Sequence, residues 1–495
     1  MTIRELLTCA QIRFDPNQLI DHDINKIAIH SKTIEKGDVF VAIRGSTHDG
    51  HDYIEEAIGR GCGTILYEDP YYSLTPMTGV NAIRVPDTKK ALALLSRWFY
   101  GNPGQDLTVV GVTGTNGKTT ITTIIHRLHR LLNEPSTLIG TNGIYLNDEY
   151  VPTVNTTPNA LTLYQTFRQS VDRGIKRVAI EVSSHAIKEQ RVSQIDFHGM
   201  IYTNFSHDHL DYHVTVDDYF YNKALSFAYL GNQYNEKFAL FNGDDEYAKR
   251  FYEVSQVRNY TYGLKEQNDF RALNAVCSLD RLAFDLSIFG QPYGRFETNN
   301  LFGFYNLYNL LAALSYFFLE GYDLDRIRPL VPLIPQVRGR FEKVKTPYPI
   351  DVIIDFAHTP KGVYNLLQEV KLITNQPIIT VIGCGGDRDR AKRPLIGKIV
   401  TSLSDFAIFT DDNPRDERSD KILDEIVKGA VNNHFLTIPD RREAIQFAVR
   451  FAKKGDLVLI LGKGHETTQE IGGVTYPFDD YEEAKRSIEQ RFMEE

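Results

Sequence analysis

The chain has 495 residues, too many for a single hydrophobic core, and its length suggests about three domains. With 64 acidic against 55 basic side chains, its formal net charge of −9 argues against a surface that binds nucleic acid or anionic membranes. Its four cysteines form no C-x-x-C pair, which indicates neither a disulfide framework nor a zinc ribbon. Residues 1–16 are too polar for a signal peptide, and no apolar run approaches the roughly 18 residues of a membrane span. We therefore expect a soluble cytoplasmic enzyme that does not insert into a membrane. We also expect a monomer, which is an expectation separate from the composition.

The first block of the sequence runs to about residue 103. Short apolar runs predict strands at residues 38–43 and 63–67, and a helix follows at residues 91–100. The sequence Gly-Asn-Pro-Gly at residues 101–104 has the composition of a linker. We place the first domain at residues 1–103.

The second block, residues 104–334, alternates predicted strands and helices. This alternation is typical of a mostly parallel sheet that is covered on both faces. The predicted elements are a strand at 107–113, a helix at 121–132, strands at 178–182 and 199–203, and an apolar helix at 306–320.

The third block, residues 335–495, has the same character. Each predicted strand is followed by polar or glycine-rich sequence, where the ligand crevice of an open α/β sheet lies. The strands are expected at 351–354, 378–382, 406–409 and 457–461. The predicted fold class is therefore α/β, in three domains.

Residues 107–120 carry the most informative motif, LTVVGVTGTNGKTT. A β-branched strand runs into a glycine-rich turn, and Lys118 and Thr119 then open a helix. Backbone N–H groups of such a loop bind phosphate oxygens, the lysine reaches the β/γ-phosphates, and the threonine hydroxyl meets Mg²⁺. The loop is a variant, because Val112 stands where the strict P-loop pattern has glycine, and Gly114 and Gly117 make the turn. The alternative is an ordinary βα turn, but the coincidence of strand, loop, lysine and helix favours a nucleoside triphosphate site.

Glu181 lies at the carboxyl end of the predicted buried strand 178–182 and could be a further ligand of the nucleotide-bound Mg²⁺. A local cap or pair at the strand end is the simpler interpretation of this residue alone. Residues 203–213, TNFSHDHLDYH, hold three histidines, His207, His209 and His213. A dinuclear hydrolase could use such a cluster, but the histidines cannot easily face one ion and have no H-E-x-x-H spacing. We expect one of them to serve a metal or phosphate, and the role of the motif stays open.

Two groups of polar residues belong to the third block. Arg340 could stabilise a transferring phosphoryl group, or form a surface ion pair with Glu342, and Asp355 could bind ribose hydroxyls. Three further loops follow strands, at residues 383–390, 411–417 and 462–466. Their arginines suit a carboxylate and their Asp412 and Glu466 suit an ammonium, which favours an amino-acid pocket over merely solvated loops.

Six motifs in this order resemble the Mur ligase family over nearly the whole chain. They are GTNGKTT at 114–120, EVSSH at 181–185, DHLDYH at 208–213, NLYN at 306–309, DFAHTP at 355–360 and DNPR at 412–415. The resemblance implies a small UDP-binding first domain, a central P-loop ATPase-type domain and a Rossmann-like third domain. The motifs are most similar to the ligases that add the third amino acid of the peptidoglycan precursor, which implies a part in cell wall biogenesis, cell shape and division.

The implied reaction is ATP-dependent. ATP phosphorylates the D-Glu carboxylate of UDP-MurNAc-L-Ala-D-Glu, and the amine of meso-diaminopimelate then attacks the acyl phosphate. The Asp-Asn-Pro-Arg form implies diaminopimelate rather than lysine, because Arg415 can bind a distal carboxylate that lysine lacks.

The resemblance also implies the following site residues. ATP is implied to contact Gly114, Thr115, Asn116, Gly117, Lys118, Thr119, Thr120, Asn306, Arg340 and Asp355. Mg²⁺ is implied at Thr119, Glu181, His209 and Lys223, with a CO₂-derived carbamate on Lys223; without the family, Lys223 would be a solvated helix lysine. Lys118, Glu181, His209 and Lys223 form the implied catalytic set. The UDP substrate is implied at Ser31, Thr156, Thr157, Ser183 and Arg191, and the amino acid at Arg388, Asp412, Asn413, Arg415, Gly462 and Glu466.

Other functions stay open at this point. The chain departs from the family pattern at Asn222, Arg338 and Glu189, among others, near the ATP and acceptor positions. A diverged ligase could therefore join L-Lys or another amino acid to a different carboxylate, as folylpolyglutamate synthases extend theirs. A P-loop kinase or regulator would not need Lys223 or the amino-acid loops, and a metal-dependent hydrolase would leave Lys118 and Thr119 unexplained.

Overall fold

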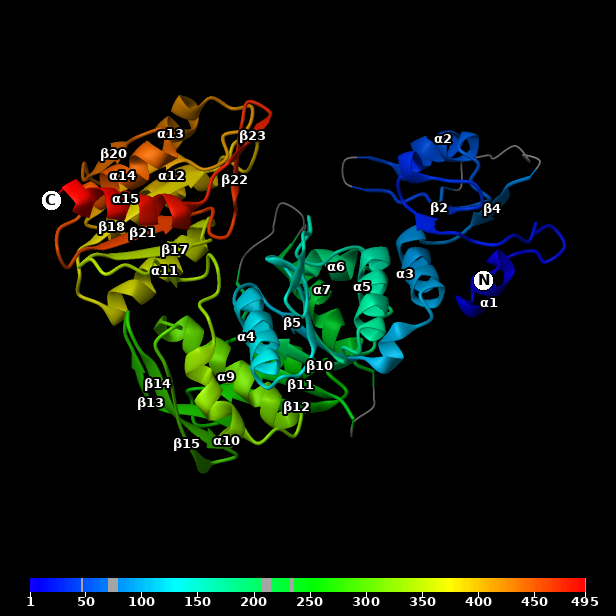
Figure 1. Ribbon diagram of the computed structural model, residues 1–495, viewed down its shortest axis with the longest axis horizontal. Coiled ribbons are helices and arrows are strands. Elements are labelled where there is room, and N and C mark those ends of the chain that lie inside the picture. Colours follow the sequence, from blue (N-terminus) through cyan, green and yellow to red (C-terminus); the bar gives the residue numbers. More distant parts are fainter. Residues whose placement is uncertain (46–47, 70–78, 207–214, 232–235, 495) are drawn as a thin grey trace. The chain divides into compact units, whose positions relative to one another are not determined.

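A computed structural model describes residues 1–45, 48–69, 79–206, 215–231 and 236–494 (Figure 1). The chain divides into two compact units, one of residues 1–205 with 215–261 and one that includes residues 262–495. The predicted domain boundaries at 103/104 and 334/335 stay a proposal. None of the described helices is long and apolar enough to cross a membrane.

The first unit begins with a four-stranded parallel sheet of order β1-β2-β3-β4. Its strand side chains alternate between two apolar clusters, one shared with α1 and α3 and the other with α2. Helix α3 begins where Asp87 accepts a hydrogen bond from the Lys90 amide, a standard N-cap. The elements are α1 (Ile3–Cys9), β1 (Ile27–Ala28), η1 (Ser31–Thr33), β2 (Val39–Val41), η2 (Gly50–Tyr53), α2 (Ile54–Gly59), β3 (Thr64–Tyr67), β4 (Asn81–Arg84) and α3 (Thr88–Phe99).

The same unit continues with strands in the order β8-β7-β6-β9-β5-β10-β11. Five neighbouring strands, β6, β9, β5, β10 and β11, are parallel. Strands β7 and β8 are antiparallel additions that the sequence analysis did not predict. The elements are η3 (Pro103–Asp106), β5 (Thr108–Thr113), α4 (Lys118–Leu131), β6 (Ser136–Gly140), β7 (Gly143–Leu146), β8 (Glu149–Val151), α5 (Ala160–Asp172), β9 (Arg177–Glu181), α6 (Ser184–Lys188), β10 (Phe197–Tyr202), α7 (Val216–Ala228), β11 (Phe238–Asn242) and α8 (Ala248–Tyr252).

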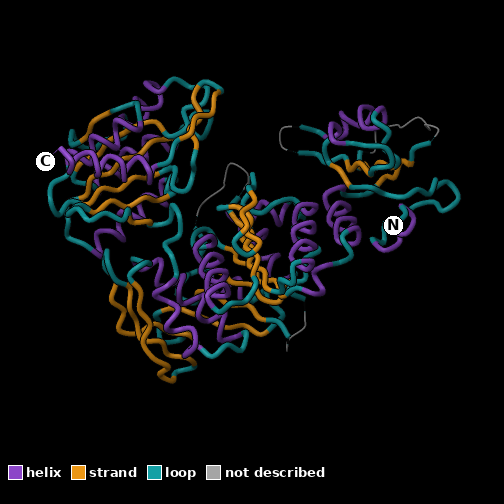
Figure 2. Tube along the Cα trace, in the orientation of Figure 1, coloured by secondary structure: helices purple, strands orange, loops and turns teal. Residues whose placement is uncertain are grey.

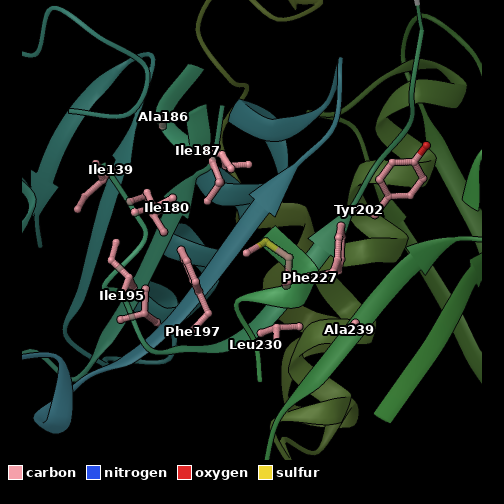
Figure 3. Packing of buried hydrophobic residues seen from close by; sticks show 14 of the residues in the cluster. Ile139, Ile180, Ala186, Ile187, Ile195, Phe197, Tyr202, Phe227, Leu230 and Ala239 are labelled. Carbon is pink, nitrogen blue, oxygen red and sulfur yellow. The ribbon is translucent and has the colours of Figure 1, made fainter. Parts of the chain in front are cut away.

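An apolar cluster on one face of these strands packs against α5, α6 and α7. Figure 3 shows part of it, with Ile180 and Phe197 from the strands close to Ile187 and Ile195. Helix α4 contacts β5, β6 and β9 through its own apolar stripe, which includes Ile121 and Leu128. Both faces of the parallel strands are thus covered, as predicted.

The second unit opens with antiparallel strands and an apolar helix. Strand β12 (Arg258–Gly263) spans the boundary between the units, and β13, β14 and β15 follow as a meander. This meander was also missed by the sequence analysis. The elements are β13 (Phe270–Cys277), β14 (Leu282–Ile288), β15 (Gln291–Thr298), α9 (Gly303–Leu319), α10 (Leu324–Ile327) and η4 (Arg328–Leu333).

The rest of the second unit is a six-stranded sheet of order β16-β17-β21-β18-β19-β20, parallel except for β16. One apolar cluster holds α11, α12 and α13 against this sheet, and another holds α14 and α15. Figure 2 shows the strands of this sheet in orange and its helices in purple, at the C-terminal end of the chain. The elements are β16 (Glu342–Lys343), β17 (Asp351–Asp355), α11 (Pro360–Ile373), β18 (Ile378–Cys384), α12 (Lys392–Leu403), β19 (Phe406–Asp411), α13 (Ser419–Val427), β20 (Phe435–Thr437), α14 (Arg441–Phe451), β21 (Leu457–Leu461), β22 (Thr468–Ile471), β23 (Val474–Pro477) and α15 (Asp480–Glu494). The prediction of a three-part α/β fold is confirmed.

Candidate active site

The glycine-rich loop joins β5 to α4, as the sequence predicts. Gly114 has φ +140°, and a Cβ there would lie 1.9 Å from Thr203 Oγ1. Gly117 has φ +89° and immediately precedes Lys118, the first residue of α4. Both positions therefore require glycine, Gly114 for space and Gly117 for its left-handed backbone. The variant motif still makes a tight turn into a helix N-terminus.

Side chains from the end of β10 hold this loop in place. Asn204 Oδ1 accepts a hydrogen bond from the Asn116 amide at 3.0 Å, and Thr203 Oγ1 donates to the Asn116 carbonyl at 2.6 Å. Lys118 Nζ donates to the carbonyls of Gly114 and Thr115, both at 2.8 Å, so its ammonium lies over the loop. Phosphate oxygens would meet this ammonium and the first amides of α4, which include that of the buried Thr120.

Glu181 lies beside the start of α4 and is 1 % exposed. Its Oε2 accepts from Thr119 Oγ1 at 3.0 Å and from Thr141 Oγ1 at 3.2 Å, and its Oε1 accepts from the Thr141 amide at 2.8 Å. A Cβ on Gly140 would lie 2.2 Å from Oε1, so glycine makes room for the carboxylate. These partners lie far away in the sequence, and the interpretation of Glu181 as a local cap is therefore wrong. A buried carboxylate and hydroxyl are the oxygen donors that Mg²⁺ prefers.

Lys223 lies on α7 and is also 1 % exposed. Its Nζ donates to the Gly114 carbonyl at 2.8 Å and lies 4.9 Å from the centre of the Tyr219 ring. The hydroxyl of Tyr219 lies 3.3 Å from Thr115 Oγ1, within hydrogen-bond distance. Helix α7 thus contacts the loop twice, and the alternative of a solvated lysine is wrong. Tyr219 is a residue that the sequence analysis missed, although its spacing of four from Lys223 places both on one helix face.

The fourth predicted metal ligand, His209, lies outside the described residues, as do His207 and His213. Within the described part of the chain, no three His, Cys, Asp or Glu side chains form a cluster that could hold a metal ion. The metal site therefore stays a prediction, supported by the arrangement of Thr119, Glu181 and Lys223.

The residues expected to bind the muramoyl peptide lie next to Glu181. Thr157 Oγ1 donates to the Glu181 carbonyl at 2.7 Å and accepts from the Ser183 amide at 3.1 Å. Arg191 Nη1 donates to the Thr157 carbonyl at 2.8 Å. Thr156 Oγ1 accepts from Thr141 Oγ1 at 3.1 Å. The first unit thus brings all four predicted residues together near Glu181, at the end of β9.

Ser31, the predicted uridine contact, lies in the first sheet domain. It is buried, and its hydroxyl donates to Glu56 Oε2 at 2.7 Å. The hydrogen bond lowers the pKa of Glu56 below its usual value. The role of Ser31 in binding uridine stays a prediction.

In the second unit, Asp355 ends strand β17 and accepts two backbone hydrogen bonds, from Phe341 at 2.7 Å and Ala357 at 2.8 Å. Burial raises the pKa of Asp355, although the Arg340 charge opposes the rise. The Arg340 guanidinium lies 4.6 Å from the centre of the Phe356 ring. Glu342, its proposed surface partner, accepts instead from the Gly339 amide at 2.7 Å. The geometry favours a stacked, partly buried arginine.

Asn306, predicted to hold adenine, is buried within helix α9. Its Nδ2 donates to the Phe302 carbonyl at 2.9 Å, and its Oδ1 accepts from Asn309 at 3.2 Å. These bonds stabilise the first turns of α9, and contact with adenine stays a prediction.

The three loops predicted to bind an amino acid converge at one end of the six-stranded sheet. Asn413 Nδ2 donates to Glu466 Oε2 at 3.0 Å, which ties the loop after β19 to the loop after β21. A Cβ on Gly462 would lie 2.6 Å from Asp412 Oδ2. Arg415 Nη1 donates to the Gly386 carbonyl at 2.7 Å, which ties in the loop after β18.

Several polar atoms of these loops have no partner within the described part of the chain. They are both carboxylate oxygens of Asp412, Oε1 of Glu466, Nη2 of Arg415 and the guanidinium of Arg388. Arg388 lies near Arg415, since both approach within 4 Å of a Cβ placed on Gly385. The unused groups are acceptors for an ammonium and donors for a carboxylate, which matches the predicted zwitterion.

The residues that depart from the family pattern have local structural partners. Asn222 donates to the Asp218 carbonyl one turn earlier on α7, at 2.7 Å. Arg338 pairs with Asp479, and Glu189 pairs with Lys89 of helix α3 at 2.6 Å. Each of these departures therefore has a polar partner within its own unit.

Family sequence models match three stretches of the chain. Residues 23–100 match the model described as "Mur ligase family, catalytic domain", residues 112–317 the Mur ligase middle domain, and residues 339–464 the model described as "Mur ligase, glutamate ligase domain". Together they account for most of the sequence.

Among known proteins, the chain is 41 % identical over 475 residues to a UDP-N-acetylmuramoyl-L-alanyl-D-glutamate–2,6-diaminopimelate ligase of Geobacillus thermodenitrificans, covering 95 % of this chain and 96 % of that one. A solved structure of a ligase with the same name matches with a TM-score of 0.69 at 29 % identity, over 98 % of this chain and 99 % of that one. The MurF ligase of Thermotoga maritima in complex with ADP has a TM-score of 0.64 at 18 % identity, over 95 % and 98 %, which shows the shared fold. With these matches along nearly its full length, the chain belongs to the Mur ligase family.

Proposed function

We propose that this enzyme joins meso-diaminopimelate to the D-Glu carboxylate of UDP-MurNAc-L-Ala-D-Glu with conversion of ATP to ADP and phosphate, in the synthesis of the peptidoglycan precursor in the cytoplasm. The relatives that carry the name of this ligase support the two substrates. The solved structure of the MurF relative was obtained in complex with ADP, which supports the use of ATP as the nucleotide.

The observation that carries the proposal is the set of unused groups in the converging loops. Asp412 and Glu466 offer carboxylate oxygens, whereas Arg415 and Arg388 offer guanidinium N–H groups. Diaminopimelate has two amino-acid ends, and its distal carboxylate distinguishes it from lysine. A guanidinium donates to such a carboxylate with charge-assisted hydrogen bonds.

The phosphate loop and its neighbours would do the phosphoryl transfer by positioning and charge stabilisation. Lys118 and the first amides of α4 hold the phosphates, and the acceptor carboxylate lies near Thr156, Thr157, Ser183 and Arg191, beside Glu181. Mg²⁺ held by Thr119, Glu181, His209 and a carbamylated Lys223 would neutralise phosphate charge. A carbamate there replaces the Lys223 ammonium, which would repel the cation, with an anionic oxygen ligand.

The test is formation of the tripeptide product by the purified protein from ATP, UDP-MurNAc-L-Ala-D-Glu and meso-diaminopimelate, followed by mass spectrometry. We expect the product mass with the unmodified chain and none with Lys118→Ala, which should still bind the UDP substrate. A diverged ligase with another acceptor would give no product, and turnover by Lys118→Ala would contradict the loop assignment.

A further inference from the structure

Lys463 lies in the loop between β21 and β22, and its side chain is completely buried. Its Nζ donates to Glu466 Oε2 at 2.9 Å and to Asn413 Oδ1 at 3.0 Å. A buried ammonium is costly unless it is paired and hydrogen-bonded. These two contacts therefore account for the presence of a charge inside this loop, and both go to residues expected to bind the amino acid.

The contacts fix the orientation of Asn413. Its Oδ1 accepts from Lys463 Nζ and from the Glu470 amide at 3.0 Å, and both of these groups can only donate. The oxygen must therefore face them, and Nδ2 must face Glu466 Oε2. Two donors thus occupy one oxygen of Glu466 and leave Oε1 for another partner.

Glycines on both sides of Lys463 determine where the loop lies. Gly462 has φ +114° and Gly464 has φ +55°. A Cβ on Gly462 would lie 2.6 Å from Asp412 Oδ2, and one on Gly464 would lie 2.7 Å from Phe356 Cβ. The loop is therefore packed between the Asp412 carboxylate and the backbone and Cβ of Phe356, the residue whose ring lies beside the Arg340 guanidinium. From this buried position, Lys463 bonds to Asn413 in the loop after β19 and to Glu466 in the loop after β21.

We infer that Lys463 is a positioning residue for the incoming amino acid. It holds Glu466 and Asn413 in one arrangement, so that Glu466 Oε1 and the Asp412 carboxylate are available to an ammonium group. It also cancels one of the two negative charges that would otherwise repel each other in this pocket. The inference rests on the proposed function, since it concerns the binding of the same amino acid.

The test is steady-state kinetics of Lys463→Met, which keeps an unbranched apolar side chain and removes the charge. Because a charge-assisted hydrogen bond is worth roughly a factor of 10 or more in binding, the KM for diaminopimelate should rise at least ~10-fold. The KM values for ATP and UDP-MurNAc-L-Ala-D-Glu should stay within about threefold of the original values. A general loss of structure would instead raise all three KM values. Lys454→Met, at an exposed lysine of the same domain, is the matched control and should change nothing.

A double-mutant cycle with Glu466→Gln distinguishes a Lys463 that positions Glu466 from a Lys463 that only stabilises the folded domain. If Lys463 acts through Glu466, the double variant should bind diaminopimelate no worse than Glu466→Gln alone, because the two effects are not additive. An unchanged KM for diaminopimelate in Lys463→Met, or additive losses, would overturn the inference. If Lys463→Met does not fold, the inference requires the double variant to fold again, because it removes the Glu466 charge that would be left without its lysine partner. A double variant that also fails to fold contradicts the inference. An unmodified chain without diaminopimelate-dependent turnover would instead contradict the proposed function.

Discussion

Lys223 on helix α7 donates a hydrogen bond from its Nζ to the Gly114 carbonyl of the phosphate loop, at 2.8 Å and almost completely buried. The two residues are 109 positions apart in the sequence. The glycine-rich loop proposed to bind phosphates therefore has the amine of Lys223 bonded to its first glycine, and a carbamate formed there with CO₂ would place an anionic group beside this loop.

Replacement of this lysine should abolish activity without preventing nucleotide binding. We expect Lys223→Ala to lower kcat by about 10²–10³-fold, the range found when a preorganised electrostatic group is removed from an active site. Short-chain carboxylates should restore part of the activity, because they can occupy the space of the carbamate. The measurement is ADP formation with and without added acetate or formate. Full activity of Lys223→Ala would contradict the role given to the residue.

The Glu181 carboxylate should determine the dependence on magnesium. Glu181→Gln keeps the shape, and its one amide oxygen can still accept from the Thr119 and Thr141 hydroxyls. It loses the bond from the Thr141 amide and the charge that a cation needs. The Mg²⁺ concentration for half-maximal activity should rise about 10-fold or more, on the scale of one charge-assisted contact. Titration with MgCl₂ measures this, with Glu246→Gln, at an exposed glutamate, as the control. An unchanged titration curve would remove Glu181 from the metal site.

Arg415 should decide between diaminopimelate and lysine. Its guanidinium is held by the Gly386 carbonyl and by Glu470, with 3.2 Å between Nε and Oε2, which leaves Nη2 for a ligand. Arg415→Ala should lower kcat/KM for meso-diaminopimelate by roughly 10–100-fold, the value of a charge-assisted hydrogen bond to a carboxylate. Turnover with L-lysine should change little. Arg418→Ala, which removes an exposed arginine paired with Asp420, is the control. An equal loss of kcat/KM with both amines would show that Arg415 does not bind the distal carboxylate.

Glu417 should stabilise the loop that carries Arg388. It accepts from both Nη atoms of the buried Arg393 at 3.0 Å and from the Asp387 amide at 2.7 Å, and these contacts lower its pKa from 4.5 to about 2. Because the folded state holds the carboxylate charged, its stabilisation is fully present above the unfolded pKa and is lost as the pH falls from about 4.5 towards 2. Glu417→Gln should lower the free energy of unfolding by about 1–2 kcal/mol at neutral pH.

Calorimetry at several pH values checks this expectation. The difference in Tm between the two proteins should be constant from about pH 8 to 5 and should shrink at lower pH. A difference that grows on acidification would contradict the charged state assigned to Glu417. Glu489→Gln, at an exposed glutamate of α15, provides the control.

Local patterns were enough to predict the parallel strands and the motifs at their ends. Strand β5 with Gly114, Gly117 and Lys118 could be identified because strand, turn and helix start are encoded within a few consecutive residues. Likewise, the carboxyl ends of β18, β19 and β21 had to meet at one edge of a parallel sheet, so the convergence of their loops followed from topology.

Long-range contacts could not be predicted in this way. The Thr141 amide meets Glu181 across 40 residues, and Lys463 meets Asn413 across 50, and no local pattern encodes such pairs. The antiparallel strands β13, β14 and β15 alternate irregularly in their burial, so the period-two signal of a strand is weak. The burial of Lys463 was equally hidden, because nothing in a glycine-rich loop indicates that a lysine side chain turns inward.

The most direct test of the central proposal is phosphate release from ATP in the presence of UDP-MurNAc-L-Ala-D-Glu, compared between meso-diaminopimelate and L-lysine. The arrangement of Asp412, Glu466, Arg388 and Arg415 predicts release that depends strongly on diaminopimelate, with little above background for lysine. Release that is equal with both amines, or faster with lysine, would contradict the assignment of these loops to a diamino acid with two carboxylates.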